Sequence, residues 1–405
     1  MENCSQDISS ILHSQYIIDG VRFDVPPIAL IDENAAIETG APDIVDESLE
    51  PSIGSICYDC GKIHEYLDLV SEQRGTDRDF NMVSPEHFAR LRAASALIDM
   101  IWMDGHLRLG DLGVELEWIW NTAPVGNMAG FYRSVESVSG YLYDLGVDIV
   151  RYKVIRSACC PGKDIDEGSS HFNVHASLVS KKASSDEDSP DFPFIFKSSP
   201  YESRHPHLNG GRACMENASC CETNWIIYIP FDICPFKTGG SVLAERTGDG
   251  NAVAPNIADP DYFIDCYEVL RELVEDSIIV SGVTVSDGGI ARALKRFSSG
   301  NGLQTSWKGV MSSYQEPDLI KILFSEIPGV LVEITDENFD YFDSQLLLQD
   351  VAYYPIGHPA PGKDGLIFTS DEKNALVDII SSLMGQASEG EDLKTDNSTI
   401  QNTTT

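Results

Sequence analysis

Long apolar runs are absent from this sequence of 405 residues. No stretch of about 18 or more apolar residues occurs, so we expect no membrane-spanning helix. The first residues carry neither the basic nor the apolar region of a secretory signal peptide, which favours an intracellular, cytoplasmic location. Three enzyme motifs are also missing: the Gly-x-x-x-x-Gly-Lys-Ser/Thr phosphate loop, the His-Glu-x-x-His pair and the Gly-x-Ser-x-Gly elbow. Several enzyme classes are thereby excluded.

Basic residues are scarce as well. Lysine and arginine together number 28 against 64 aspartates and glutamates, and the formal net charge is -36. Such a surface repels nucleic-acid phosphates and anionic lipids over about one Debye length, so we expect neither nucleic acid nor a membrane as a partner. The ten cysteines are scattered or adjacent rather than regularly spaced, which predicts free thiols in a reducing compartment.

The length and the 42% hydrophobic content suit two domains, each with its own core. Composition divides the chain into an acidic N-terminal arm (1–48), a first domain (49–182), a linker or insertion (183–222), a second domain (223–385) and a disordered tail (386–405). Within the arm, the apolar runs at 16–18 and 28–31 could add an edge strand to a sheet or remain extended, and the sequence leaves both open.

Three helices have both the periodicity and the end signals of an amphipathic helix. They are predicted at 85–103 with Ser84 as the N-cap, at 129–145 before Gly146, and at 260–276 after Asp259. Shorter helices are predicted at 290–297, 318–324 and 371–384, and strands at 225–229, 278–280, 330–334, 351–356 and 366–369. Strands mixed with helices and returning turns predict an α+β fold.

The clearest candidate site is the turn Ser286, Asp287, Gly288 and Gly289, which joins a predicted strand to a predicted helix. The backbone amides of a helix N-terminus favour a phosphate, and Asp287 could hold a Mg2+ ion that bridges phosphates. The simpler alternative is that Ser286 or Asp287 caps the helix while the glycines form the turn.

Five stretches, in this order along the chain, resemble the second AIR-synthase-like half of phosphoribosylformylglycinamidine (FGAM) synthase. They are 87–97 (HFARLRAASAL), 117–120 (EWIW), 238–244 (TGGSVLA), 285–289 (VSDGG) and 323–330 (LFSEIPGV). The resemblance runs from about residue 53 to 361. It implies a two-domain PurM-like unit, the fold shared with aminoimidazole ribonucleotide synthetase, with ATP or ADP and Mg2+ as cofactors.

Several positions depart from the family pattern. Where the family presents metal ligands, this chain has Ser55, Ser95 and Asp99, and only Asp287 is kept; Asp99 could still act as an oxygen donor. The family's Gly-Lys-Asp-Ser motif reads 152–155 (YKVI), so Lys153 alone remains to meet a phosphate. The His-Asp pair ahead of the turn is 283–284 (VT). The resemblance therefore implies a nucleotide site at Lys153 and 286–289, with a weakened metal site at Asp287 and Asp99.

The resemblance implies a purine-biosynthesis protein, a partial unit of an ATP-dependent amide-to-amidine ligase. We expect such a unit to be unable to perform glutamine-dependent synthesis alone, because one AIR-synthase-like unit and no amidotransferase segment are visible. The alternative is a non-enzymatic interaction protein on the same scaffold, as in the FGAM-synthase-like tegument proteins of some herpesviruses. Whether the chain is an enzyme stays open. A solitary unit is expected to form a homodimer or to bind a partner that supplies the missing AIR-synthase-like half and the amidotransferase.

Two further groupings could bind metal. Cys57 and Cys60, with His64 four residues on, have the spacing of a zinc half-site, and the stretch around 205–221 could supply further ligands. The simpler interpretation is free thiols and surface histidines. His171 and His175 lie on an alternating, strand-like segment, where residues four apart stand roughly 13 Å apart, so we do not expect them to share a metal.

Overall fold

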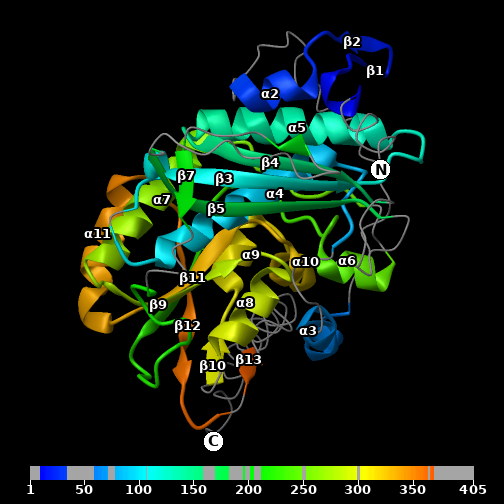
Figure 1. The fold of residues 1–405 in the computed structure, drawn as a ribbon. Helices are drawn as coiled ribbons and strands as arrows, with labels where there is room; N and C mark the ends of the chain where they lie inside the picture. Colours follow the sequence, from blue (N-terminus) through cyan, green and yellow to red (C-terminus); the bar gives the residue numbers. More distant parts are fainter. Residues whose placement is uncertain are drawn as a thin grey trace, which may run out of the picture.

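The computed structural model describes residues 10–33, 59–71, 78–105, 107–157, 169–181, 195–196, 201–204, 211–248, 252–298, 302–363 and 365–368. These residues form a five-stranded sheet, a six-stranded sheet and an N-terminal hairpin, with helices flanking the sheets (Figure 1). Two sheets of mixed strand direction, covered by helices, confirm the predicted α+β class. No helix in these ranges is long and apolar enough to cross a membrane.

The five-stranded sheet has the order β6-β4-β3-β5-β7. Its strands are β3 (Leu112–Trp120), β4 (Asp148–Arg156), β5 (His171–Lys181), β6 (Ile195–Phe196) and β7 (Tyr201–Arg204). One face packs on α5 (Asn127–Asp144): the buried Trp118 ring meets Phe131 edge to face, and its indole nitrogen donates to the Ser134 hydroxyl at 3.1 Å. Strands β6 and β7 lie in the stretch predicted as a linker, so part of that stretch extends the sheet.

The six-stranded sheet has the order β13-β10-β12-β8-β11-β9. Its strands are β8 (Trp225–Pro230), β9 (Ile279–Val285), β10 (Gly302–Thr305), β11 (Gly329–Ile334), β12 (Tyr354–Ala360) and β13 (Leu366–Phe368). Strand β9 runs five residues beyond the predicted end at Val280, because its pairing with β11 continues to Val285 opposite Gly329. The predicted strand at 351–356 starts later, since its ladder with β8 begins at Tyr354.

The three long helices form where the periodicity predicts them. They are α4 (Pro85–Ile98), which continues into the 3-10 turn η3 (Asp99–Trp102), then α5, and α7 (Pro260–Glu275). The Asp259 carboxylate caps α7 by accepting from the Tyr262 amide at 3.0 Å, and Gly146 ends α5 with a φ of +70°. Ser84 stands at the N-cap of α4, but the predicted cap bond is wrong: its hydroxyl instead accepts from the Ala254 amide at 2.9 Å.

The remaining elements are shorter. They are α2 (Pro27–Glu33), η2 (Cys60–Lys62), α3 (Ile63–Ser71), η4 (Leu109–Asp111), α6 (Val242–Thr247), α8 (Gly289–Phe297), α9 (Lys308–Tyr314), α10 (Leu319–Phe324), η7 (Asp336–Asn338) and α11 (Phe339–Leu348). Helices α8 and α10 match predicted helices. The predicted helix at 371–384 and the tail at 386–405 lie outside the described residues.

The N-terminal segment packs on the outside of α5, as Figure 1 shows. Strand β1 (Tyr16–Ile18) pairs with β2 (Val21–Phe23) in a hairpin, and the second apolar run lies in α2. The rings of Tyr16 and Tyr132 lie 5.0 Å apart, and the Tyr132 hydroxyl donates to the Val25 carbonyl at 3.0 Å. In the described structure, therefore, neither apolar run joins an edge of the two large sheets, and the segment forms a packed hairpin and helix instead of an extended arm.

The two sheet layers meet at η3. The buried Trp102 ring covers Gly282 of β9, where an added Cβ would lie 2.2 Å from a ring carbon. The Trp102 indole nitrogen donates to the Thr284 hydroxyl at 2.8 Å. The segment after residue 211 contacts both layers through isolated β-bridges. Arg212 pairs with Met103, and Met215 pairs with Ser281 of β9. This junction places β9 against η3, which belongs to the N-terminal layer formed by the five-stranded sheet and its helices.

Candidate functional site

The turn predicted as a site lies where β9 gives way to α8. Gly288 and Gly289 have φ angles of +80° and +65°, which side chains other than glycine rarely adopt. A Cβ at Gly289 would also lie 2.6 Å from the Ser325 carbonyl oxygen. Both glycines are therefore required by the backbone, and they hold Ser286 and Asp287 at the junction of the two layers.

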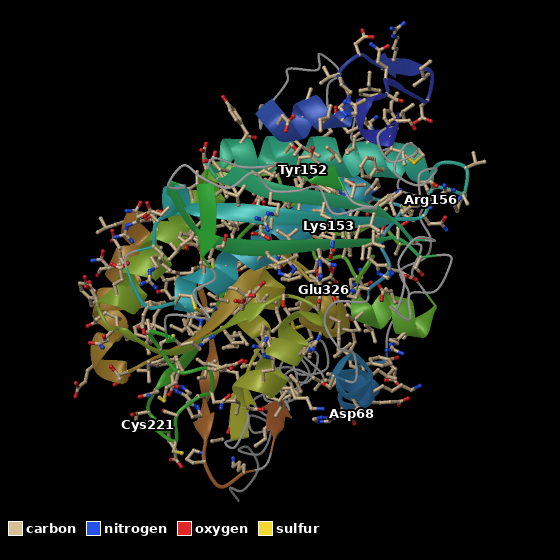
Figure 2. The ribbon with its side chains drawn as sticks, viewed as in Figure 1. Asp68, Tyr152, Lys153, Arg156, Cys221 and Glu326 are labelled. Atoms are coloured by element: carbon tan, nitrogen blue, oxygen red, sulfur yellow. The ribbon has the colours of Figure 1, made fainter. Side chains whose placement is uncertain are left out.

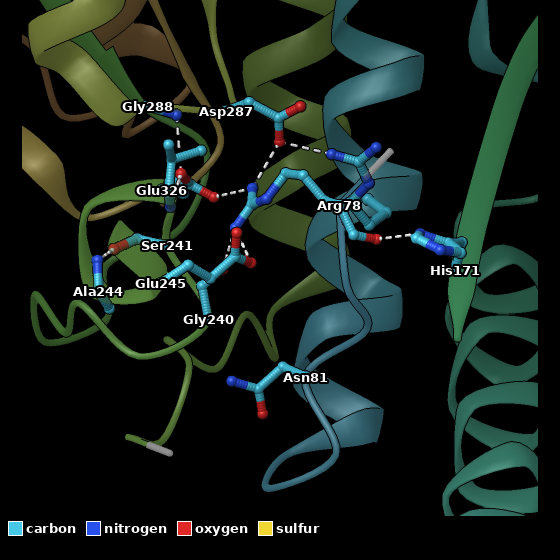
Figure 3. A network of polar contacts seen from close by, with 12 residues as sticks. Arg78, Asn81, His171, Gly240, Ser241, Ala244, Glu245, Asp287, Gly288 and Glu326 are labelled. Atoms are coloured by element: carbon cyan, nitrogen blue, oxygen red, sulfur yellow. Dashed lines mark hydrogen bonds and ion pairs between the residues drawn. The ribbon is translucent and has the colours of Figure 1, made fainter. Parts of the chain in front are cut away.

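A buried arginine, Arg78, organises this junction (Figure 3). Its Nη1 lies 2.7 Å from an Asp287 carboxylate oxygen and 2.5 Å from Glu326, and its Nη2 lies 3.2 Å from Glu245. The same Nη2 donates to the Gly240 carbonyl. The Arg78 side chain is only 2% exposed. One guanidinium thus satisfies acceptors from three separate elements of the second layer.

A second arginine completes the neutralisation of Asp287. Arg92 of α4 donates to the same Asp287 oxygen that Arg78 contacts. Burial alone would raise the pKa of Asp287, but the Arg92 and Arg78 guanidinium groups outweigh it and hold that pKa below its usual value. Burial would lower the pKa of Arg78, whereas Glu326, Asp287 and Glu245 raise it, so the guanidinium stays charged.

Glu326 occupies the anion position at the helix N-terminus. Its Oε1 accepts from the Gly288 amide at 2.7 Å and from the Val242 amide at 2.8 Å. The Gly289 amide donates to the Ser286 carbonyl at 2.8 Å. Burial raises the pKa of Glu326, and Arg78 offsets part of that rise. The amides that we expected to face a phosphate are therefore in part used by the chain's own carboxylate.

A cavity of about 190 Å³ opens beside the turn. It is lined by Thr284, Ser286, Asp287, Arg292, Ala293 and Arg296. Arg292 and Arg296 are one turn apart on α8, so both present a charge to the same space, although Arg296 also pairs with Glu216. Drug-sized ligands need about 300 Å³ or more, whereas one water takes roughly 30 Å³. The cavity therefore suits an anion of phosphoryl or diphosphoryl size.

The residues at Asp287 do not suit a divalent cation. Magnesium prefers several anionic or neutral oxygen donors, but Asp287 faces two guanidinium groups that would repel Mg2+. Asp99, the other candidate ligand, is exposed at the start of η3. Within the described ranges, no three His, Cys, Asp or Glu side chains are arranged to hold a metal. The described residues therefore offer Mg2+ no suitable set of ligands. Ser55 lies outside the described residues.

Lys153 lies in β4 of the five-stranded sheet, and its pairing with Glu117 puts it on the face opposite Trp118. Figure 2 labels Lys153 and Glu326. Its ammonium is 3.2 Å from Glu117, and Asn173 donates to the same carboxylate at 3.2 Å. Lys153 does not line the cavity described above. The structure therefore brings together Ser286, Asp287, Gly288 and Gly289 but not Lys153.

The remaining metal candidates are separated in the fold. His171 is buried, and its Nδ1 lies 2.7 Å from the Arg78 carbonyl oxygen, whereas His175 is exposed on the same strand. Cys60 is exposed and forms no disulfide, and Cys57 lies outside the described residues. No described grouping therefore gathers the predicted zinc ligands.

Sequence reasoning missed Arg78, Arg92, Glu245 and Glu326 as members of the site. Glu326 and Arg92 lie inside two of the five family-like stretches, so a search for charged residues within those stretches could have found them. Arg78 carries no comparable signal, because it lies in a polar stretch without periodicity and meets its partners only through the tertiary fold.

The chain is similar in sequence to several known proteins. No protein-family model matches the chain. It is 23% identical over 277 residues to "Phosphoribosylformylglycinamidine synthase" of Homo sapiens, covering 67% of this chain and 18% of that protein. It is 21% identical over 309 residues to "Probable phosphoribosylformylglycinamidine synthase, chloroplastic/mitochondrial" of Arabidopsis thaliana, covering 74% and 20%. A "Probable membrane antigen 3" of Saimiriine herpesvirus 2 is 31% identical over 123 residues, covering 30% and 9%.

Solved structures with detectable similarity include "T. maritima PurL complexed with FGAR", with a TM-score of 0.49, 13% identity, and coverage of 73% of this chain and 43% of that chain. Another is "Hydrogenase Maturation Protein HypE in complex with ATP", with a TM-score of 0.41, 13% identity, and coverage of 69% and 75%.

The fold and the site define an α+β unit whose strand-turn-helix site is closed by ion pairs between two sheet layers. The similarity to the two curated synthases confirms the family predicted from the five sequence stretches: the chain is a relative of the FGAM synthases. It spans about a fifth of the length of those synthases.

Proposed function

We propose that the chain is a purine-synthesis-related unit that binds the phosphoryl part of a nucleotide without performing the ligase reaction by itself. The cavity beside Ser286 carries this proposal, because Arg292 and Arg296 both line a space of phosphoryl size, and Arg296 also pairs with Glu216 there. The similarity to FGAM synthases supports a nucleotide as the source of that phosphoryl group. The nucleoside part would lie outside the cavity.

The same geometry argues against independent catalysis. Amide activation by ATP develops charge on transferring phosphoryl oxygens, which needs a preorganised cationic environment. Here Arg92 already forms an ion pair with Asp287, and Arg78 forms ion pairs with Asp287 and the neighbouring carboxylates. We expect binding of ADP or ATP with no release of ADP from ATP above background.

Isothermal titration with ADP, once in EDTA and once in MgCl2, tests the proposal. Binding is expected in both buffers, and Arg292→Gln should weaken it about tenfold or more, as expected for one lost charge-assisted hydrogen bond. Lys295→Gln is the matched control: it removes a charge from the same helix, but Lys295 pairs with Asp68 and does not line the cavity. No heat at millimolar ADP, or equal losses in the two variants, would refute nucleotide binding.

A second candidate is a non-enzymatic interaction protein on the same scaffold. The Glu117–Lys153 ion pair on the five-stranded sheet favours it, because it adds charge to a sheet face that also carries Ile119 and Ile155. A second copy or a larger partner docking on this face would be held by charge. Sedimentation velocity at low and high salt tests this: a species that stays monomeric at micromolar concentration in low salt contradicts it.

A further inference from the structure

Three carboxylates converge at the junction of the layers, and each comes from a different element. Glu245 belongs to α6, Asp287 precedes α8, and Glu326 follows α10. Their side chains are 25%, 15% and 9% exposed. Such a convergence is unfavourable without a cation between the groups, because charges of one sign repel strongly where water is excluded.

In this chain the cation is a side chain. Arg78 lies ahead of α4, in the N-terminal layer, and its guanidinium faces all three carboxylates (Figure 3). A guanidinium keeps its charge at all physiological pH values and offers five N–H donors in a planar fork. It can therefore bridge several carboxylates at fixed angles, as a coordinated metal does with oxygen ligands.

We propose that Arg78 is the resident cation of this site, supplying the positive charge that the three carboxylates need and joining the two sheet layers through it. The unmodified protein is therefore independent of divalent cations in both its stability and its ligand binding. Arg78→Ala removes this cation and leaves a vacancy edged by three carboxylates. That vacancy accepts a small cation from solution, methylguanidinium first because of its matching shape.

Thermal unfolding of the full chain without nucleotide tests the proposal. The unmodified protein should unfold at the same temperature in EDTA, MgCl2 and MnCl2 at equal ionic strength. Arg78→Ala should unfold several degrees lower, and methylguanidinium should restore about 3 °C or more. MnCl2 should give no comparable gain, because the three carboxylates are not arranged to hold a metal. Because no nucleotide is present, this outcome is separate from the outcome of the ADP titration.

Arg108→Ala is the matched control. Arg108 also faces three glutamates, Glu268, Glu272 and Glu275, at 3.5, 3.9 and 3.5 Å, but it is 38% exposed, so water replaces it. Methylguanidinium and MnCl2 should not raise its unfolding temperature. If Arg78→Ala does not fold, Arg78→Lys supplies the test: a retained charge should fold and stay insensitive to MnCl2.

Two results would overturn the assignment. One is a rise in the unfolding temperature of the unmodified protein with Mg2+ or Mn2+. The other is rescue of Arg78→Ala no larger than that of Arg108→Ala, or stabilisation of Arg78→Lys by MnCl2.

Discussion

The carboxylate of Glu326 gives the sharpest test of the site's energetics. Its Oε1 accepts from the Gly288 and Val242 amides at 2.7 and 2.8 Å, and its Oε2 lies 2.5 Å from Arg78. Glu326→Gln keeps the shape but offers one oxygen and one NH2 group. If the oxygen faces the two amides, the NH2 group points at the Arg78 guanidinium; if the side chain flips, both amides lose their acceptor.

Either orientation leaves a buried donor without an acceptor, which costs about 1–3 kcal/mol for a neutral group and more for a charged one. The raised pKa of Glu326 works in the opposite direction, because the neutral amide avoids the cost of burying a charge. We expect a net loss of about 2–4 kcal/mol in the free energy of unfolding. For a cooperative unit of roughly 300 residues this corresponds to about 3–6 °C in Tm.

Urea unfolding followed by tryptophan fluorescence measures this loss, because Trp102, Trp118 and Trp307 are fully buried. Glu337→Gln, at an exposed position of η7, is the control and should change stability by less than about 0.5 kcal/mol. In the double variant Glu326→Gln/Arg78→Met the charge pair is gone altogether. Its loss should fall short of the sum of the single losses by about 1 kcal/mol or more. Additive losses, or a Glu326→Gln loss no larger than the control, would refute the coupling.

Two further predictions concern neighbouring residues. Gly282→Ala places a Cβ 2.2 Å from the Trp102 ring and should cost about 1–3 kcal/mol in urea unfolding, whereas Gly110→Ala, with open space around it, should cost well under 1 kcal/mol; equal effects would contradict the packing described. Asp287→Asn should alter the pH dependence of stability. The native pKa of Asp287 is lowered, so its contribution is complete above the unfolded value of about 3.9 and is lost as the pH falls through the native pKa. The stability gap between the unmodified protein and Asp287→Asn should therefore narrow from pH 5 to pH 3, and a constant gap would contradict this assignment.

Local patterns in the sequence predicted the elements whose stability is largely local. Helices α4, α5 and α7 carry an apolar stripe of helical period and recognisable ends, such as Asp259 and Gly146, and all three form. The turn at Gly288 was predictable for the same reason, since only glycine fits its backbone angles. Where a strand end depends on a partner strand, as at Val285 opposite Gly329, the sequence of the strand alone does not reveal it.

The sequence pointed to only some of the residues around the cavity. The family-like stretches predicted a nucleotide site at Lys153 and 286–289, and the cavity is lined by Ser286 and Asp287 but not by Lys153. What surrounds Asp287 depends on residues brought from elsewhere by the fold. Arg78 has no periodic or motif signal, and the Ser84 hydroxyl bonds to Ala254 instead of capping α4, because distant backbone approaches it. Tertiary proximity of this kind is not encoded in local spacing.

The Arg78 cluster also has a consequence for the order in which the chain folds. Its contacts join Arg78 to Gly240, Asp287 and Glu326 across sequence separations of 162, 209 and 248 residues. Closing such loops is entropically costly until other contacts hold the layers together, so we expect these bonds to form after the sheets. Interactions that form after the folding transition state slow unfolding and leave the folding rate almost unchanged. We therefore expect the buried ion pairs to lower the rate at which the two layers of the folded protein separate, and to have little effect on the rate of folding.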